Sequence, residues 1–286
     1  MPKSHDVVPN LLLPKDGVDE PNEVDDPAKV GPVIVNDGEV EVPKREAVIW
    51  YDSCELRYSD FNFFGIPDTA GFSMSNPNQK TSSREPFAVV ADLVKAAPLN
   101  KPLMFASKAL VNDDDNIYAL AQCTVDLGVD GCRECLTTIL ADIKNCCTQW
   151  RGWRYLATSC WVRYESTPFL KNLNGTPTEI TQYSCSDSTF PSNSLAIVES
   201  NLNNLLQILT TNAQTSGFYN TTVGENPDQL YGLALCRGDL TPPSNDCNTC
   251  LANARGTIIG DCPNNTQGIK WALIPPGNPE HSAEDA

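Results

Sequence analysis

The cysteines of this chain recur with one spacing in two parts of the sequence. In each part a cysteine precedes a Cys-x₂-Cys pair, and a further cysteine follows twelve residues after that pair. The members are Cys123, Cys132, Cys135 and Cys147 in the first copy and Cys236, Cys247, Cys250 and Cys262 in the second. Neighbouring segments recur with them, since IYALAQC at 117–123 matches LYGLALC at 230–236. A shared order of several elements indicates a structural repeat, so we expect two related units.

The chain has twelve cysteines in all. An even number at patterned spacing favours disulfides formed in an oxidising compartment. Structural zinc is the rival interpretation, because each Cys-x₂-Cys pair provides half of a tetrahedral site. Each pair begins a helix-like stretch, however, and no second pair follows at zinc-finger spacing within the same unit. We therefore expect disulfides, with no metal and no cofactor.

Secretion is supported by some features of the sequence and opposed by another. Three glycosylation sequons begin at Asn174, Asn220 and Asn264, as in many secreted proteins. The first twenty residues do not resemble a signal peptide, because the apolar run Leu11–Leu13 is short and acidic residues follow it. Three explanations stay open: the chain is a fragment, its N-terminus was replaced, or it is not exported.

Composition excludes several classes of function. The net charge of −16 argues against a nucleic-acid partner held by a basic field. The two histidines, His5 and His281, lie near the chain ends, so the folded region offers no Ser-His-Asp or Cys-His centre. We also find no Gly-rich phosphate loop and no apolar run long enough to span a bilayer. We expect a protein that is not an enzyme and has no membrane span in this chain.

Hydrophobic periodicity predicts the same elements in both copies. Helices are expected at Arg84–Ala97 and Ser194–Thr210, and a second helix in each copy begins at the Cys-x₂-Cys pair. Strand-like stretches are Met104–Leu110, Ile117–Cys123, Arg154–Glu165, Ala47–Arg57 and Tyr231–Cys236. An α+β fold is therefore expected, with tandem disulfide-stapled domains that each pack two helices on an antiparallel sheet.

The repeat copies are unequally complete, which sets the predicted domain boundaries. The segments are a disordered acidic leader (1–45), the C-terminal piece of a first-type repeat domain (46–66), a complete second-type repeat domain (67–170), a linker (171–181), the N-terminal piece of a first-type domain (182–272) and a disordered tail (273–286). The chain is either cut from a longer array or permuted. We predict that the piece at 46–66 adds to the sheet of the piece at 182–272.

These motifs resemble the plant cysteine-rich secretory repeat, the antifungal domain of ginkbilobin type. The first copy matches the C-x₈-C-x₂-C signature of that family, and the second departs from it by two inserted residues. The family occurs in tandem in cysteine-rich receptor-like kinases, plasmodesmata-located proteins and secreted repeat proteins. Residues 50–65 and 217–240 resemble the first domain of such a tandem, and residues 146–169 resemble the end of the second. The family places the first domain before the second, so the order of the pieces here looks permuted or truncated.

The resemblance also implies a disulfide pattern. The implied bridges are Cys123–Cys132, Cys135–Cys160, Cys185–Cys262, Cys236–Cys247 and, across the permuted pieces, Cys54–Cys250. Each bridge stabilises a fold by roughly 2–4 kcal/mol in the chain-entropy account. Cys146 and Cys147 have no partner in this pattern, and their state stays open.

Ginkbilobin-like relatives bind mannose through one Asn, one Arg and one Glu. The matching positions here are Asn76, Arg154 and Glu165, so the resemblance implies a carbohydrate-binding set, although Ser75 replaces the family's cysteine before the Asn. A planar cationic donor beside an anionic acceptor suits vicinal sugar hydroxyls. The alternative is that Arg154 and Glu165 form a cross-strand ion pair with a structural role only.

The resemblance finally implies a function and a location. We expect a secreted, apoplastic protein that acts as a non-catalytic interaction module in plant defence or cell-to-cell signalling. The alternative is a mannose-binding antifungal lectin. The expected partners are mannose-type glycans or cell-surface proteins.

Overall fold

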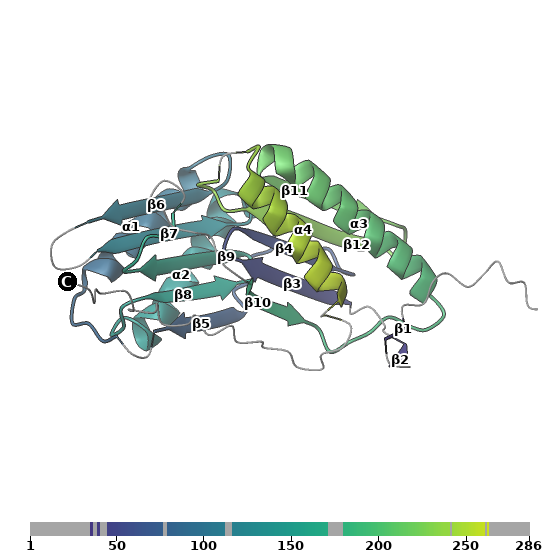
Figure 1. Cartoon of the computed structure of the whole chain (residues 1–286), viewed down its shortest axis with the longest axis horizontal. Coiled ribbons are helices and arrows are strands. Elements are labelled where there is room, and N and C mark those ends of the chain that lie inside the picture. Colours follow the sequence, from purple (N-terminus) through teal and green to yellow (C-terminus); the bar gives the residue numbers. More distant parts are fainter. Residues whose placement is uncertain are drawn as a thin grey trace, which may run out of the picture. The chain divides into compact units, whose positions relative to one another are not determined.

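Two five-stranded antiparallel sheets form the framework of the chain (Figure 1). The computed structural model describes residues 35–36, 39–40, 45–76, 79–111, 116–170, 180–240, 242–260 and 262. Four α-helices lie within these residues, and they divide evenly between the two sheets. The predicted α+β class is confirmed.

The first sheet is built from the middle of the chain, with strand order β5-β8-β9-β7-β6. Its strands are β5 (Gly71–Ser75), β6 (Phe105–Leu110), β7 (Ile117–Cys123), β8 (Trp153–Ala157) and β9 (Cys160–Glu165). The helices α1 (Glu85–Ala96) and α2 (Gly128–Cys146) cover one face, and the short 3₁₀ helices η1 (Ala97–Leu99) and η2 (Val125–Leu127) precede β6 and α2. Val90, Leu136 and Ile139 pack from the helices against Trp153 and Val162 of the sheet.

The second sheet combines two distant parts of the chain, in the order β10-β3-β4-β12-β11. Its strands are β3 (Glu46–Tyr51), β4 (Cys54–Ser59), β10 (Ile180–Cys185), β11 (Phe218–Val223) and β12 (Leu230–Cys236). The helices α3 (Leu195–Ser216) and α4 (Asn245–Gly260) pack on one face through Leu205, Leu209 and Leu251. The hairpin β3–β4 thus occupies the middle of a sheet whose other strands come from residues 180–236, as the permuted arrangement requires.

Disulfides fix both units at the positions that the resemblance implied. Their Cα–Cα distances of 5.6 to 6.1 Å fit ordinary bridge geometry. These bridges are Cys54–Cys250, Cys123–Cys132, Cys135–Cys160, Cys185–Cys262 and Cys236–Cys247. The two cysteines that the pattern left over, Cys146 and Cys147, form a sixth bridge with each other.

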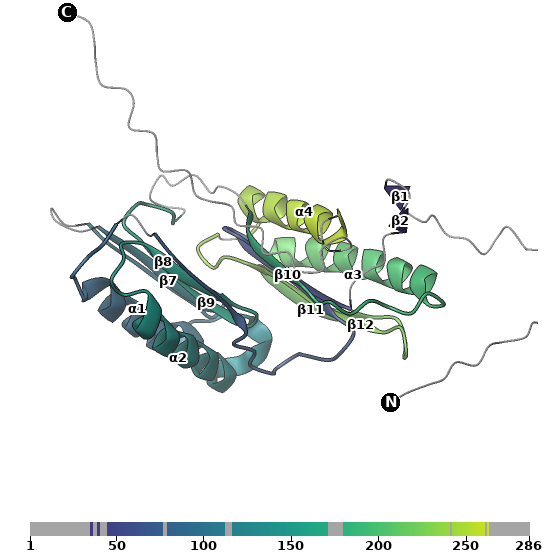
Figure 2. The same ribbon diagram turned by 90° about the horizontal axis from the view of Figure 1, so that it is seen from below.

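The faces of the sheets that carry no helix pack together (Figure 2). In β4, Cys54, Leu56 and Tyr58 point into the core under α3 and α4, and the residues between them face the other sheet. A third hydrophobic cluster lies between the sheets, with Trp50 and Leu235 from the second sheet and Leu120, Leu156 and Trp161 from the first. Figure 2 shows α1 and α2 on one outer side and α3 and α4 on the other.

Several predicted boundaries differ from the structure. The stretch Ala47–Arg57 was expected as one strand, but it is a hairpin that turns at residues 52–53, and Arg154–Glu165 likewise turns at residues 158–159. Asp, Ser and Thr occupy these turns, and their side chains favour tight turns by bonding to nearby backbone. Strand β10 begins at Ile180, inside the predicted linker 171–181.

The predicted leader and tail fall mostly outside the described residues. Within the leader 1–45, the strands β1 (Val35–Asn36) and β2 (Glu39–Val40) form a short antiparallel ladder. The tail 273–286 lies wholly outside the described residues. In the described part of the chain no helix has the length and apolar character of a membrane span.

We predict that the bridge Cys54–Cys250 contributes more stability than the bridge Cys123–Cys132. The first closes a sequence separation of 196 and the second a separation of 9, and all four cysteines are buried. Chain entropy gives about 5 kcal/mol for the long loop and about 2–3 kcal/mol for the short one. Urea unfolding of the two paired Cys→Ala variants measures both losses. A smaller loss for the Cys54→Ala, Cys250→Ala variant would contradict the prediction.

Candidate functional site

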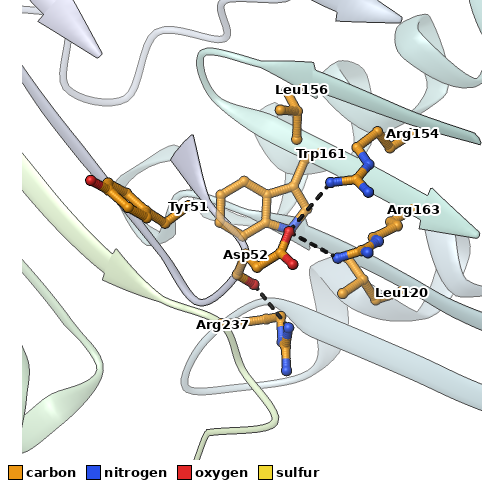
Figure 3. Close-up of a pocket in the computed structure, with 8 residues that line it drawn as sticks. All are labelled: Tyr51, Asp52, Leu120, Arg154, Leu156, Trp161, Arg163 and Arg237. Carbon is orange, nitrogen blue, oxygen red and sulfur yellow. Dashed lines mark hydrogen bonds and ion pairs between the residues drawn. The ribbon is translucent and has the colours of Figure 1, made fainter. Parts of the chain in front are cut away.

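Three separate segments of the chain meet around Asp52 (Figure 3). Asp52 lies in the turn between β3 and β4, Arg154 and Arg163 lie on β8 and β9, and Arg237 follows β12 directly. A small pocket at this point is lined by Tyr51, Asp52, Leu120, Arg154, Leu156, Trp161, Arg163 and Arg237. The pocket therefore lies between the two sheets.

Two carboxylates, of which only Asp52 lines the pocket, bridge two of its arginines. Asp52 Oδ1 accepts hydrogen bonds from Arg154 Nη1 at 3.3 Å and from Arg163 Nη1 at 3.1 Å. Glu165 Oε1 accepts from Arg154 Nη2 at 3.0 Å and from Arg163 Nε at 2.9 Å. Arg154 and Arg163 are directly opposite each other in the β8–β9 ladder, a pairing of like charges that is unfavourable by itself. The two acids offset this repulsion and link β8 and β9 to the β3–β4 turn.

Arg237, which follows β12, binds the same turn between β3 and β4. Its Nη1 donates to the backbone oxygen of Asp52 at 2.8 Å, and its Nη2 donates to the backbone oxygen of Phe169 at 3.1 Å. Asp239 pairs with it at 2.6 and 3.1 Å. The guanidinium of Arg163 lies 4.1 Å from the centre of the Phe169 ring, at cation–π distance. Arg237 is almost fully buried, so these bonds replace its hydration.

Burial lowers the pKa of Arg154, and the neighbouring charge of Arg163 lowers it further. Glu165 and Asp52 act in the opposite direction and favour the charged guanidinium. The side chain of Arg154 is only 9% exposed, so its charge depends on these two acids rather than on water. The network consequently acts as a structural clamp between the two sheets.

The three residues expected to bind a sugar do lie together. Asn76 donates its backbone N–H to the oxygen of Gly152 at 3.0 Å. Gly152 has a φ of +84°, and a Cβ there would lie 2.7 Å from Glu165 Oε2, so both the backbone and the close approach favour glycine. Arg154 and Glu165 form the ion pair of the alternative interpretation, and Arg154 also binds Asp52. Sugar hydroxyls would have to compete with these contacts, so the structure does not favour the lectin interpretation or a mannose-type partner.

The remaining predicted positions are less informative. Asn220 lies on the edge strand β11, whereas Asn174 and Asn264 lie outside the described residues. Among the residues that the structure describes, no group of three His, Cys, Asp or Glu side chains is arranged to hold a metal ion. Sequence reasoning did not identify Asp52, Arg163 or Arg237 as site residues.

A second buried polar group lies on the same inter-sheet face of β4. Glu55 is fully buried, and neither of its carboxyl oxygens has a hydrogen-bond partner. Burial raises the pKa of Glu55 well above its usual value, with Asp126 raising it further and Arg57 opposing both. Arg57 pairs with Glu46 at 2.7 Å, and one carboxylate oxygen of Asp126 is also unpartnered. Burial therefore favours the protonated, neutral form of Glu55 in the folded protein.

Comparison with known families identifies the chain. The salt stress response/antifungal family matches residues 74–167 and 184–274, which together form more than half of the sequence. The chain belongs to this family. The two matched ranges correspond to the first sheet with its helices and to the piece that begins at β10, and the hairpin β3–β4 lies outside both.

Individual members of the salt stress response/antifungal family are similar in sequence to less than half of this chain. The antimicrobial ginkbilobin-2-like protein of Castanea crenata is 39% identical over 44% of this chain and 55% of its own length. Cysteine-rich repeat secretory protein 38 of Arabidopsis thaliana is 32% identical over 44% of this chain and 53% of its own length. The chain thus spans about half the length of the curated relatives it matches.

Solved structures of the family support the same fold. The tandem DUF26 ectodomain of the Arabidopsis thaliana cysteine-rich receptor-like protein PDLP8 matches with a TM-score of 0.53 and 25% identity, over 67% of this chain and 87% of that one. The corresponding ectodomain of PDLP5 matches in fold, with a TM-score of 0.52 and 20% identity, over 67% and 88%. Of the relatives named here, the Arabidopsis thaliana repeat protein is named as secretory, and the two solved structures are ectodomains of receptor-like proteins.

We predict that Asp52→Asn destabilises the protein. The substitution leaves Arg154 and Arg163 opposite each other with one carboxylate fewer, and removing one partner of a mostly buried ion pair costs about 2–4 kcal/mol. Asp130→Asn is the control, because Asp130 is 95% exposed and pairs with Arg133 only at the helix surface. Equal free energies of unfolding for the two variants, measured by urea titration, would refute the clamp.

We predict that Glu55 makes the protein less stable as the pH rises. Below pH 4.5, its ordinary pKa, the carboxyl is neutral in both folded and unfolded chains. Above that value the unfolded chain loses the proton first, so stability falls by up to about 1.4 kcal/mol per pH unit until the raised pKa is passed.

The variant Glu55→Gln isolates this effect, because its side chain is neutral at every pH. The free energy of unfolding is measured from pH 4 to pH 8, and the advantage of Glu55→Gln over the natural protein should grow with pH. Glu225→Gln, at an exposed position before β12, is the control and should follow the natural protein. Parallel curves for all three proteins would show that Glu55 does not titrate in this way.

Proposed function

We propose that the protein is a secreted, apoplastic interaction module that acts without catalysis in plant defence or cell-to-cell signalling. Membership of the salt stress response/antifungal family supports this proposal, as do the secretory and ectodomain relatives. The name of the Castanea crenata relative supports a defence role. Cell-surface proteins are the proposed partners, and glycosylation at Asn174, Asn220 and Asn264 is part of the same proposal.

The ion-pair network around Asp52 is the observation that carries the proposal. It joins Arg154 and Arg163 of the first sheet to the β3–β4 turn of the second. A partner can then contact residues of both units as one rigid surface, with little ordering cost on binding. The same network occupies Arg154 and Glu165, which a lectin would need for sugar hydroxyls.

Binding to intact plant cells tests the proposal. Fluorescently labelled protein is added to protoplasts that are untreated, treated with protease, or treated with an endoglycosidase that removes mannose-type glycans. We expect saturable binding that protease abolishes and the endoglycosidase leaves unchanged. Loss of binding after glycan removal, together with weaker binding of Arg154→Ala, would favour the lectin instead. Absence of saturable binding to any of these cells would refute the interaction module.

The variant Asp52→Asn tests whether partner binding depends on the ion-pair network between the two sheets. Because the substitution loosens the link between the two units, we expect weaker binding to untreated protoplasts at a temperature where the variant is still folded. Asp130→Asn, on the exposed surface of α2, serves as the matched control and should bind normally. Equal binding by the two variants would show that the partner contacts one unit only.

A further inference from the structure

The bridge between Cys146 and Cys147 differs from every other bridge of the chain. All twelve cysteines lie in the described residues, and Cys146 alone is exposed, whereas Cys147 is 4% exposed. The pair closes the C-terminal end of α2, where Cys146 is the last helical residue and Cys147 is the C-cap. The two cysteines are adjacent in sequence, so their bond closes no chain loop and restricts the unfolded chain hardly at all.

Comparison with the second repeat shows that Cys147 lacks a partner cysteine on a neighbouring edge strand. Cys262 follows α4 as Cys147 follows α2, and it is bonded to Cys185 at the end of the edge strand β10. The edge strand at the corresponding place in the first sheet is β5, which ends at Ser75. Because a serine stands where the partner cysteine would be, Cys147 has only its neighbour to bond with.

We propose that Cys146–Cys147 is a thiol-exchange site that accepts a low-molecular-weight thiol on Cys146. The thiolate of the small molecule attacks Cys146 Sγ and forms a mixed disulfide there. The bond between the two cysteines breaks, its electron pair leaves with Cys147 Sγ, and Cys147 takes up a proton from water. The product carries one small thiol on an exposed residue, and no external oxidant is needed.

Solvent exposure explains why an incoming thiolate attacks this pair rather than another bridge. The other five bridges join residues that are buried, or half-buried in the case of Cys185, so an incoming thiolate reaches them only after local opening. They also link separate strands and helices, whereas opening Cys146–Cys147 releases no element of the fold. Modification of Cys146 should therefore leave both sheets intact.

Reaction of the folded protein with reduced glutathione tests the proposal. Samples are quenched with iodoacetamide in denaturant, so that buried thiols are also alkylated, then digested and mapped by mass spectrometry, and the melting temperature is recorded in parallel. We expect glutathione on Cys146 and alkylation of Cys147 while the other five bridges stay closed and the melting temperature is unchanged. Simultaneous opening of another bridge, or a fall in melting temperature with loss of this pair, would overturn the proposal.

Two single variants identify the attacked sulfur. Cys147→Ser leaves an exposed thiol at Cys146, and Cys146→Ser leaves a buried thiol at Cys147. With Ellman's reagent we expect the exposed thiol to react at least about tenfold faster, since reactivity requires an accessible thiolate. Circular dichroism checks that both variants are folded. Equal rates in two folded variants would overturn the assignment, and the glutathione map of the natural protein decides the question if either variant does not fold.

Discussion

The structure depends on the pairing of the hairpin β3–β4 with strands from the other end of the chain. In the described part of the chain β10 pairs only with β3, and β12 pairs with β4, so without the hairpin the second sheet would separate into two parts. Bringing together segments separated by 196 residues costs about 5 kcal/mol of loop-closure entropy for a flexible chain. The first sheet and its helices fold within the described part of the intervening residues. That folded domain acts as a short spacer and lowers the cost of closing the second sheet.

The repeat places the same side chains on both sides of the contact between the sheets. Arg57 on β4 and Arg163 on β9 are equivalent, and each lies over a phenylalanine, Phe63 at 4.0 Å and Phe169 at 4.1 Å. The surroundings then diverge, because Arg237 follows β12 whereas the equivalent residue after β7 is Thr124. Arg237 binds the backbone oxygen of Asp52 and pairs with Asp239. Glu55 lies in the sheet whose strand β12 directly precedes Arg237, but neither of its carboxyl oxygens has a hydrogen-bond partner, and burial favours its neutral form.

The sequence predicted the fold more completely than the site. Local patterns were sufficient for the fold, because helix periodicity and cysteine spacing both repeat and each copy supports the other. The turn at Asp52 was missed because Val48, Trp50 and Leu56 read as one alternating strand, although Val48 and Trp50 face the first sheet and Leu56, after the turn, faces α3 and α4. Asp52 itself carries no local signal. Its role arises when the packing of two sheets brings it to Arg154 and Arg163, residues about a hundred positions away.

Arg154 and Glu165 show how a motif match depends on its surroundings. In an isolated domain, the face of β8 and β9 that carries them would meet water, and an arginine beside a glutamate would be open to a polar ligand. In this chain the same face is covered by the second sheet, and Asp52 supplies a further carboxylate to Arg154. Any ligand must then replace a bond between charged groups that water reaches poorly, which is costly. The tandem partner, rather than the motif, thus decides whether these residues bind a ligand or join two domains.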